Sequence, residues 1–236
     1  MKKIGRPPLG KRAMTPAQKQ RRYRNKLKGL VLSATRSRNA KVFAEILRLH
    51  VRPGSTVADV THGQGHFWRL IPSGTYELLA TDLQTGVDFR KLPYLASTID
   101  CVVLDPPYMT GAGSVHRHRP DFEVRYRVNE TAPQTHQELL DLYLAGCREA
   151  KRVLRRHGVL IVKCQDEFVD GRQYLTHIEL VNGITGMGFK VLDLFIVIRT
   201  DTPVISQGVQ RVARKNHSYF LVFHKNGETG IRQASV

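Results

Sequence analysis

The sequence has few cysteines, no long apolar run and few acidic residues. Its 236 residues include only Cys101, Cys147 and Cys164, which lie far apart and form no CxxC pair. This spacing argues against a disulfide scaffold and a zinc site, and it is typical of a reducing compartment. A membrane span needs about 20 consecutive apolar residues, and no stretch of the sequence approaches that length. We therefore expect a cytoplasmic protein without a membrane partner.

Acidic residues are scarcest at the N-terminus. The chain has 37 Lys and Arg against 20 Asp and Glu, which gives a formal charge of +17. Eleven of the positive charges lie in residues 1–28, where there is no acid at all. Such an excess indicates a polyanionic partner, and nucleic acid fits better than an anionic membrane surface. The predicted phosphate contacts in this arm are Arg6, Arg21, Arg22 and Arg24; the alternative is a solvated, disordered terminus.

The order of helical and extended patterns predicts an α/β domain behind a basic arm. Thr15, Pro16 and Gln18 predict a capped helix that ends at Gly29. Apolar residues at helical spacing predict further helices at 38–50, 138–155 and 174–187. Apolar or alternating runs predict strands at 55–60, 76–83, 98–108, 159–166, 189–200 and 218–225. Such strands, separated by helices, indicate a mostly parallel sheet covered on both faces, with the last two strands as an antiparallel hairpin. The expected organisation is a basic tail with one helix at 1–29, a globular domain at 30–228 and a C-terminal tail at 229–236.

A nucleoside pocket is predicted where the first two of these strands end. The first strand runs into a turn with Gly63 and Gly65, and glycines there let the backbone approach a ligand closely. The dinucleotide pattern GxGxxG is not met, because Trp68 occupies its last position. The second strand ends at Asp82, and an acid at this place commonly accepts hydrogen bonds from ribose hydroxyls. A solvent-facing acid in an ordinary turn is the alternative.

The stretch VVLDPPY ends the next strand at the same carboxyl edge. Pro106 and Pro107 make a rigid turn and remove two backbone donors, while Asp105 adds a carboxylate that only accepts. With the ring of Tyr108 beside it, this turn favours a planar group that carries an NH₂, such as adenine or cytosine. Holding both amino hydrogens would free the nitrogen lone pair to attack an electrophile. A purely structural Asp-Pro turn is the alternative.

The motif VADVTHGQG, Asp82 and DPPY, in this order, resemble the amino-methyltransferases that use S-adenosyl-methionine, over about residues 38–225. The resemblance implies a Rossmann-like class I methyltransferase fold, with a mostly parallel seven-stranded sheet, an antiparallel C-terminal hairpin and helices on both faces. It implies a cofactor site in which the loop cradles the methionine part, Asp82 the ribose, and Asp88 and Phe89 the adenine. The loop residues so implied are Asp59, Thr61, His62, Gly63 and Gly65, and the target base would lie at Asp105, Pro106, Pro107 and Tyr108.

The resemblance also implies a substrate. In this family DPPY more often accompanies methylation of adenine N6 than of cytosine N4, so we expect a DNA adenine methylase. We expect it to be of phage or prophage type, to work in a bacterial or phage-infected cell, and to resemble the methylases of restriction-modification systems. Cytosine N4, an RNA base, and a non-catalytic nucleic-acid-binding protein on the same fold are the alternatives. Because no separate recognition segment is evident, we expect relaxed or short sequence specificity. Oligomeric state is not indicated by the sequence.

The segment between Tyr108 and Glu138 is long for a connection in a compact domain, which is typical of functional or mobile loops. It interleaves arginines with Phe122 and Tyr126, a composition that suits clamping of phosphates and stacking of bases. The predicted nucleic-acid contacts here are His116, Arg117, His118, Arg119, Arg125 and Arg127. The arginines would repel a cation, so we expect no metal at the two histidines. Further along, Gln165 or Asp166 is expected either to face the base pocket or to cap the following segment, and His217 and Ser218 to be structural.

Overall fold

The computed structural model describes residues 15–27, 29–106, 133–169, 171–200 and 212–226, and divides the chain into the compact units Met1–Leu32 and Ser33–Val236. The described part of the first unit holds helix α1, Pro16–Leu27. Its first turn is closed reciprocally: Thr15 Oγ1 accepts the Gln18 N–H at 3.2 Å, and Gln18 Oε1 accepts the Thr15 N–H at 3.0 Å. The predicted capping box is therefore confirmed.

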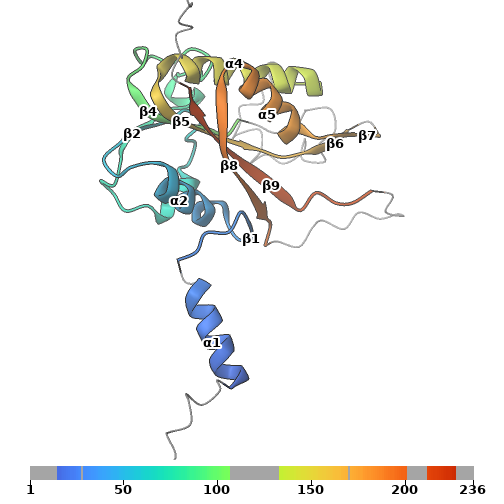
Figure 1. Ribbon diagram of the computed structural model, residues 1–236. Helices are drawn as coiled ribbons and strands as arrows, with labels where there is room; N and C mark the ends of the chain where they lie inside the picture. The colour runs from blue at the N-terminus through green and yellow to red at the C-terminus, as the bar shows by residue number, and fades with distance from the viewer. Residues whose placement is uncertain (1–14, 28, 107–132, 170, 201–211, 227–236) are drawn as a thin grey trace, which may run out of the picture. The chain divides into compact units, whose positions relative to one another are not determined.

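The second unit is built on a seven-stranded sheet with the order β1-β8-β9-β5-β4-β2-β3 (Figure 1). Its strands are β1 (Ala34–Arg36), β2 (Thr56–Asp59), β3 (Glu77–Ala80), β4 (Ile99–Leu104), β5 (Leu154–Cys164), β8 (Phe189–Ile198) and β9 (His217–Lys225). Every pairing is parallel except the two made by β9, which is antiparallel to both β5 and β8. A separate hairpin joins β6 (Glu167–Val169) to β7 (Arg172–Tyr174). The expected mostly parallel sheet with an antiparallel C-terminal hairpin is confirmed.

Helices cover both faces of this sheet. Figure 1 shows α4 (His136–Val153) and α5 (Thr176–Gly186) on one side and α2 (Asn39–His50) on the other. The side of α4 carries the larger apolar cluster, which includes Leu104, Tyr143 and Leu160. On the side of α2, aromatic rings pack together: the Phe43 ring centroid lies 5.2 Å from that of Phe67 and 6.2 Å from that of Phe220. None of the described helices combines the length and the apolar character that a membrane span requires.

The connections on either side of β3 differ from expectation. Helices were expected between successive strands, but β2 and β3 are joined through the short 3₁₀ helix η1 (His66–Leu70), and β3 and β4 through η2 (Leu83–Thr85). These connections span residues 60–76 and 81–98 and contain Pro72 and Pro93, which cannot donate a helical hydrogen bond. The chain therefore crosses from each strand to the next without an α-helix.

The junction between α4 and β5 is a second correction. A helix over residues 138–155 was expected, but α4 ends at Val153 and β5 begins at the next residue, Leu154. The pairing of β5 with β4 shifts its register between Ile99 and Cys101. His157, whose φ is 62°, lies in this irregular part of β5, so the backbone turns here without a glycine. The strands β1, β6 and β7, each three residues long, were not predicted.

Candidate active site

The turn after β2 contacts both of its neighbours at the carboxyl edge of the sheet. Because β2, β3 and β4 are parallel, their carboxyl ends meet at one edge. Gly63 donates its N–H to Asp82 Oδ2, beyond β3, at 3.0 Å. Thr61 Oγ1 accepts the N–H of Asp105, beyond β4, at 2.7 Å. The three segments predicted from the sequence to form one pocket are therefore linked directly to one another.

Two glycines allow the turn to follow this path. Gly63 has φ +52° and Gly65 has φ +65°, values that side chains disfavour. A Cβ at Gly65 would lie 2.9 Å from His62 Nε2, so the loop closes on itself there. At Gly63 the nearest atom to such a Cβ is the Thr61 carbonyl oxygen at 4.0 Å, so its backbone lies open to a ligand. The segment after these glycines is η1, a single short 3₁₀ helix.

Asp59 holds the turn from within the protein. It is 3% exposed, and its Oδ2 accepts the indole N–H of Trp68 at 2.7 Å. The same oxygen lies 3.3 Å from His62 Nδ1, and Oδ1 accepts the Thr61 N–H at 3.3 Å. The hydrogen bond to Asp59 raises the pKa of His62 above its usual value, against the opposite effect of burial. With these three donors, Asp59 organises the loop and offers little to a bound molecule.

Asp82 caps the next turn and keeps some acceptor capacity. Its Oδ1 accepts the N–H groups of Gln84 and Thr85 at 2.8 and 2.9 Å, while the Thr85 hydroxyl accepts the Asp82 N–H. Among the described residues, its Oδ2 accepts a hydrogen bond from Gly63 only. A carboxylate offers about four acceptor positions, so one remains for a ligand hydroxyl on the half-buried Asp82.

The next two predicted residues are placed differently from each other. Asp88 forms an ion pair with Arg90 at 2.6 Å, and hydrogen bonds from Arg90 lower the pKa of Asp88. Phe89 is 7% exposed and belongs to the apolar core. A Cβ at Gly146 of α4 would lie 2.7 Å from its ring. Phe89 thus packs against α4, which leaves only a small part of its ring available to a cofactor.

Asp105 differs from Asp82 in having a buried carboxylate oxygen, Oδ1, that accepts no hydrogen bond from the described residues. Burial raises the pKa of Asp105 to about 7; Lys163 acts to lower it and Asp59 to raise it further. Pro106 is buried beside it. The remaining predicted base-binding residues, Pro107 and Tyr108, lie outside the described residues.

Lys163 is a charged residue of this site that sequence reasoning did not single out. It lies on β5, is 1% exposed, and donates from Nζ to the Ser218 hydroxyl. Its Nζ also lies 4.5 Å from the ring centroid of Phe220. Burial lowers the pKa of Lys163 to about 8, against the opposing effect of Asp105. A lysine inside the apolar run VLIVKC was the signal available in the sequence.

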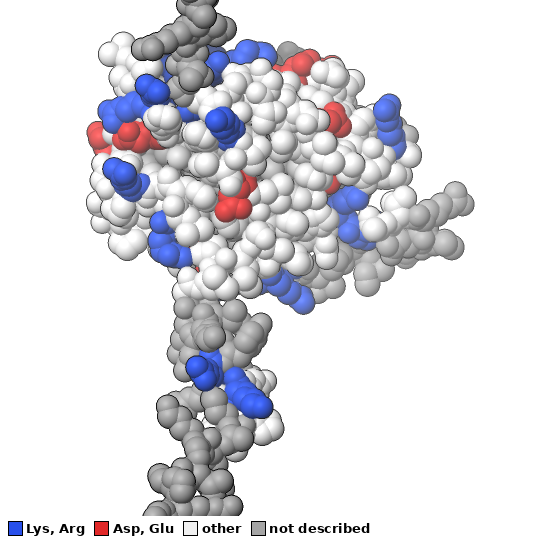
Figure 2. Space-filling view, viewed as in Figure 1, with Lys and Arg blue, Asp and Glu red and all other residues white. Residues whose placement is uncertain are grey.

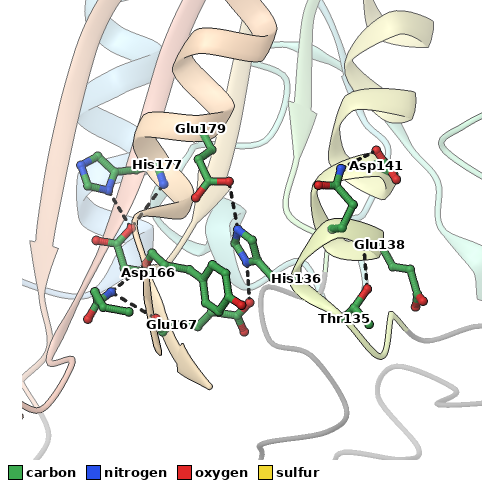
Figure 3. A network of polar contacts seen from close by, with 11 residues as sticks. Thr135, His136, Glu138, Asp141, Asp166, Glu167, His177 and Glu179 are labelled. Atoms are coloured by element: carbon green, nitrogen blue, oxygen red, sulfur yellow. Dashed lines mark hydrogen bonds and ion pairs between the residues drawn. The ribbon is translucent and has the colours of Figure 1, made fainter. Parts of the chain in front are cut away.

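A second polar cluster lies beyond the carboxyl end of β5 (Figure 3). His136, at the start of α4, lies with Nδ1 2.7 Å from Glu167 and Nε2 3.2 Å from Glu179. Asp166 accepts the backbone N–H of His177 at 3.3 Å and lies 2.6 Å from its ring Nδ1. Of the two roles expected for Asp166, the structure shows the cap of the following segment. A cavity of about 480 Å³ beside the cluster is lined by Thr135, His136, Gln137, Arg172, Tyr174 and Glu179.

This cluster does not resemble a metal centre. Within the described ranges, no group of three or more His, Cys, Asp or Glu is arranged to hold an ion. The rings instead stack: His136 lies 4.0 Å from Tyr174 and His177 4.1 Å from Tyr219, centroid to centroid. These contacts tie α4, the β6–β7 hairpin and α5 together, and they hold the segments that flank β5 in place.

The predicted nucleic-acid contacts lie mostly outside the described residues: Arg6, His116, Arg117, His118, Arg119, Arg125 and Arg127. Arg21, Arg22 and Arg24 fall on α1, where Arg22 is exposed. On the face of the globular unit in Figure 2, lysine and arginine side chains are spread around the surface without gathering in one patch. In the sequence, residues 1–28 combine eleven Lys and Arg residues with no acid.

Comparison with known proteins gives one family match. The family model for N6/N4 methyltransferases, described as DNA methylase, matches residues 99–235, somewhat over half of the chain. No curated protein sequence matches. The matched segment begins with β4 and includes Asp105 and Lys163, whereas the glycine turn and Asp82 precede it.

Solved structures show remote likeness only. TrmN from Thermus thermophilus is 17% identical over 79% of this chain and 48% of that chain, with a TM-score of 0.47. A second Thermus thermophilus protein, assigned as a DNA modification methylase and solved with S-adenosyl-L-methionine, is 23% identical over 63% and 56%, with a TM-score of 0.40. Burkholderia thailandensis 1,6-didemethyltoxoflavin-N1-methyltransferase, solved with S-adenosylhomocysteine, is 14% identical over 93% and 94%, with a TM-score of 0.49. The chain spans about half the length of the first two.

Proposed function

Because the chain belongs to the N6/N4 DNA methylase family, we propose that it transfers a methyl group from S-adenosyl-methionine to an exocyclic amino group of a base in DNA. The observation that carries this proposal is the buried Oδ1 of Asp105 at the carboxyl end of β4, which has no hydrogen-bond partner in the part of the chain that the structure describes. The family covers both adenine N6 and cytosine N4. Adenine N6 is the target that we propose, on the DPPY sequence, and cytosine N4 is the alternative.

Asp105 and the Pro106 carbonyl form the acceptor pair for the amino group. A buried acceptor without a donor is costly, and an incoming N–H removes that cost. An amino group conjugated with the base ring is planar, and its lone pair is delocalised. Two acceptors that each take one amino hydrogen favour the tetrahedral nitrogen, whose lone pair is free to attack. The base has to leave its stack to reach this edge of the sheet.

The turn after β2 and Asp82 are the residues that would hold the cofactor. Its ribose hydroxyls suit the acceptor position left on Asp82, and the open backbone at Gly63 suits its amino-acid part. When bound, S-adenosyl-methionine supplies an electrophilic methyl group on a positively charged sulfur. The protein orients the attacking nitrogen and excludes water from the reaction, contributions that need no covalent intermediate.

The reaction also requires a proton acceptor. The nitrogen gains a methyl group and must release one hydrogen as a proton, while the sulfur keeps the electron pair of the broken C–S bond. Asp105 already binds one of the amino hydrogens in this scheme. Because burial raises its pKa to about 7, Asp105 can accept the proton and release it again near neutral pH.

Labelled methyl transfer tests the activity directly. The protein would be incubated with DNA and S-adenosyl-methionine carrying a deuterated methyl group, and the digested nucleosides analysed by mass spectrometry. We expect labelled N6-methyladenine. Labelled N4-methylcytosine would move the target to cytosine, label only in an RNA substrate would refute DNA as the substrate, and no label in either would refute the methylase.

Two substitutions of Asp105 test the site. Asp105→Ala removes the acceptor and is expected to lower transfer by about 10²–10³-fold, the loss typical of a group that stabilises a transition state. Asp105→Asn keeps one acceptor oxygen and is expected to retain part of the activity. Asp141→Asn, an exposed acid on α4, is the matched control and should behave as wild type. Full turnover by Asp105→Ala would remove this residue from the chemistry.

A further inference from the structure

A row of polar side chains crosses four neighbouring strands on the α2 side of the sheet. Asp59 ends β2, Asp105 follows β4, Lys163 lies on β5 and Ser218 on β9, and these strands are adjacent in the order β2-β4-β5-β9. Leu104 pairs with Val162 across β4 and β5. The following residues, Asp105 and Lys163, are therefore neighbours whose side chains lie on the same face.

Lys163 is unusual within this row because its ammonium group is fully enclosed. Lysines are almost never fully buried unless they are paired, and this one is 1% exposed. Its Nζ donates to the Ser218 hydroxyl and lies over the Phe220 ring, 4.5 Å from the centroid. Both neighbours are neutral, so neither balances its charge.

Asp105 is the acid that balances it. The charged and titratable groups that act on Asp105 are Lys163 from β5 and Asp59 from β2. Asp59 is already satisfied by Trp68 and His62. On β5, the Cys164 thiol belongs to the cluster on the other face, the α4 side, and burial raises its pKa further above neutral. Among the described residues, Lys163 is thus the single positive group that acts on Asp105.

We propose that Lys163 is a positioning residue for the reaction: its ammonium group, held by Ser218 and Phe220, keeps the Asp105 carboxylate ionised and ready to accept the amino group. The proposal rests on the proposed function and adds to it the residue that sets the state of Asp105. A protonated Asp105 would offer a donor to the amino group and would lose part of its acceptor capacity. Because burial disfavours the ionised form, the carboxylate needs a partner charge to stay ionised.

Lys163→Met tests this because methionine fills a similar volume without the charge. A neighbouring positive charge lowers the pKa of an acid by about 1–3 units, so its loss should raise the pKa of Asp105 by that amount. The acid limb of kcat/KM against pH reports this group in the free enzyme and should move upward by about 1–3 pH units. Lys190→Met, an exposed lysine at the opposite end of the sheet on β8, is the matched control and should leave the profile unchanged.

A direct titration separates this proposal from the activity. Carbonyl ¹³C NMR of aspartate-labelled protein, without cofactor or DNA, should show Asp105 titrating near neutral pH in the wild type and at higher pH in Lys163→Met. Ser218→Ala, which removes the hydrogen bond to Nζ, should give a smaller shift in the same direction. An unchanged Asp105 midpoint in both variants would overturn the proposal, even if methyl transfer is observed. A shifted midpoint with no transfer by the wild type would instead refute the proposed function.

A double substitution covers the case in which Lys163→Met alone is poorly folded. With Asp105→Asn there is no carboxylate to keep ionised, so adding Lys163→Met should cost little further activity. The same additional loss in both backgrounds would mean that Lys163 acts by packing alone, which contradicts the proposal.

Discussion

Gly65→Ala is the substitution expected to disturb the turn after β2 most directly. Gly65 has φ +65°, and a Cβ there would lie 2.9 Å from His62 Nε2 and 3.2 Å from its Cε1. The His62 ring cannot simply swing away without cost, because its Nδ1 lies 3.3 Å from the buried Asp59. Alanine therefore introduces both backbone strain and a displacement of a hydrogen-bonded ring.

The two costs can be assigned magnitudes. An alanine held in the left-handed region costs about 1–2 kcal/mol. Loss of a hydrogen bond to a charged group costs about 1.5–3 kcal/mol, and the lower end applies because the His62 side chain is partly open to solvent. The sum is about 2.5–3.5 kcal/mol. Each kcal/mol lowers Tm by about 2–4 °C in a domain of this size, so we expect Tm to fall by about 5–14 °C.

Gly74→Ala provides the matched control. Gly74 has φ +79°, and a Cβ there would meet no atom within 4 Å. In Gly74→Ala only backbone strain destabilises the protein, so its free energy of unfolding should fall by about 1–2 kcal/mol. Thermal unfolding followed by circular dichroism would compare the two variants. Equal Tm values would refute the claim that the His62 ring closes this turn.

The same variant should impair methyl transfer more than it impairs folding. Misplacement of a reacting group by about 1 Å can cost about 10²-fold in rate. Displacement of His62 moves the turn through which Thr61 contacts Asp105 and Gly63 contacts Asp82. Transfer measured well below Tm should therefore fall by that order in Gly65→Ala and little in Gly74→Ala.

Three further predictions concern packing, a buried hydrogen bond and pH. Gly146→Ala places a Cβ 2.7 Å from the Phe89 ring and should lower the free energy of unfolding, measured in urea, by about 1–3 kcal/mol. Gly186→Ala, whose Cβ would meet no atom within 4 Å, should raise it by up to about 1 kcal/mol. The opposite order of stability would contradict both predictions. Trp68→Phe removes the N–H donated to Asp59 at 2.7 Å and should cost about 1–3 kcal/mol. A loss smaller than about 0.5 kcal/mol, on the order of an ordinary surface change, would show that His62 and Thr61 satisfy Asp59 without the indole. The folded-state pKa of Asp105 is about 7, above its unfolded value, so the folded protein binds a proton more tightly, and this contribution to stability is lost as pH rises from about 4 to 7. Asp105→Asn should therefore be more stable than the wild type at about pH 8 and lose that advantage at about pH 4–5. A stability difference independent of pH would contradict the raised pKa.

The long elements of the fold could be predicted because their signal is local. α2 and α4 carry apolar residues at helical spacing, and β4, β5, β8 and β9 are runs of apolar residues long enough to stand out. The three-residue strands could not be found in this way, because β1 exists through its pairing with β8 and β6 through its pairing with β7. Their hydrogen bonds connect segments whose proximity only the tertiary structure supplies.

The candidate site could be predicted in position but only partly in role. That Asp59, Asp82 and Asp105 follow strands predicts a common edge of the sheet, and the hydrogen bonds of Thr61 and Gly63 link the three segments there. Which oxygen is occupied depends on contacts such as the Trp68 indole, which no spacing indicates. Lys163 shows the same limit, because its relation to Asp105 follows from the β4–β5 register.

Asp59 and Asp105 differ in their hydrogen bonding: Asp59 stabilises the turn after β2, whereas Asp105 keeps an acceptor that a ligand could use. Both follow or end parallel strands at the same edge, on the same face of the sheet. Asp59 has three donors and is matched to its surroundings, as buried carboxylates usually are. Asp105 has one buried oxygen with no donor among the described residues, and its partner charge is an enclosed lysine that interrupts an apolar strand. A buried carboxylate oxygen without a donor and a fully buried lysine are both unusual, and here they are neighbours. Such departures from ordinary burial are typical of functional sites, where stability is sacrificed for activity.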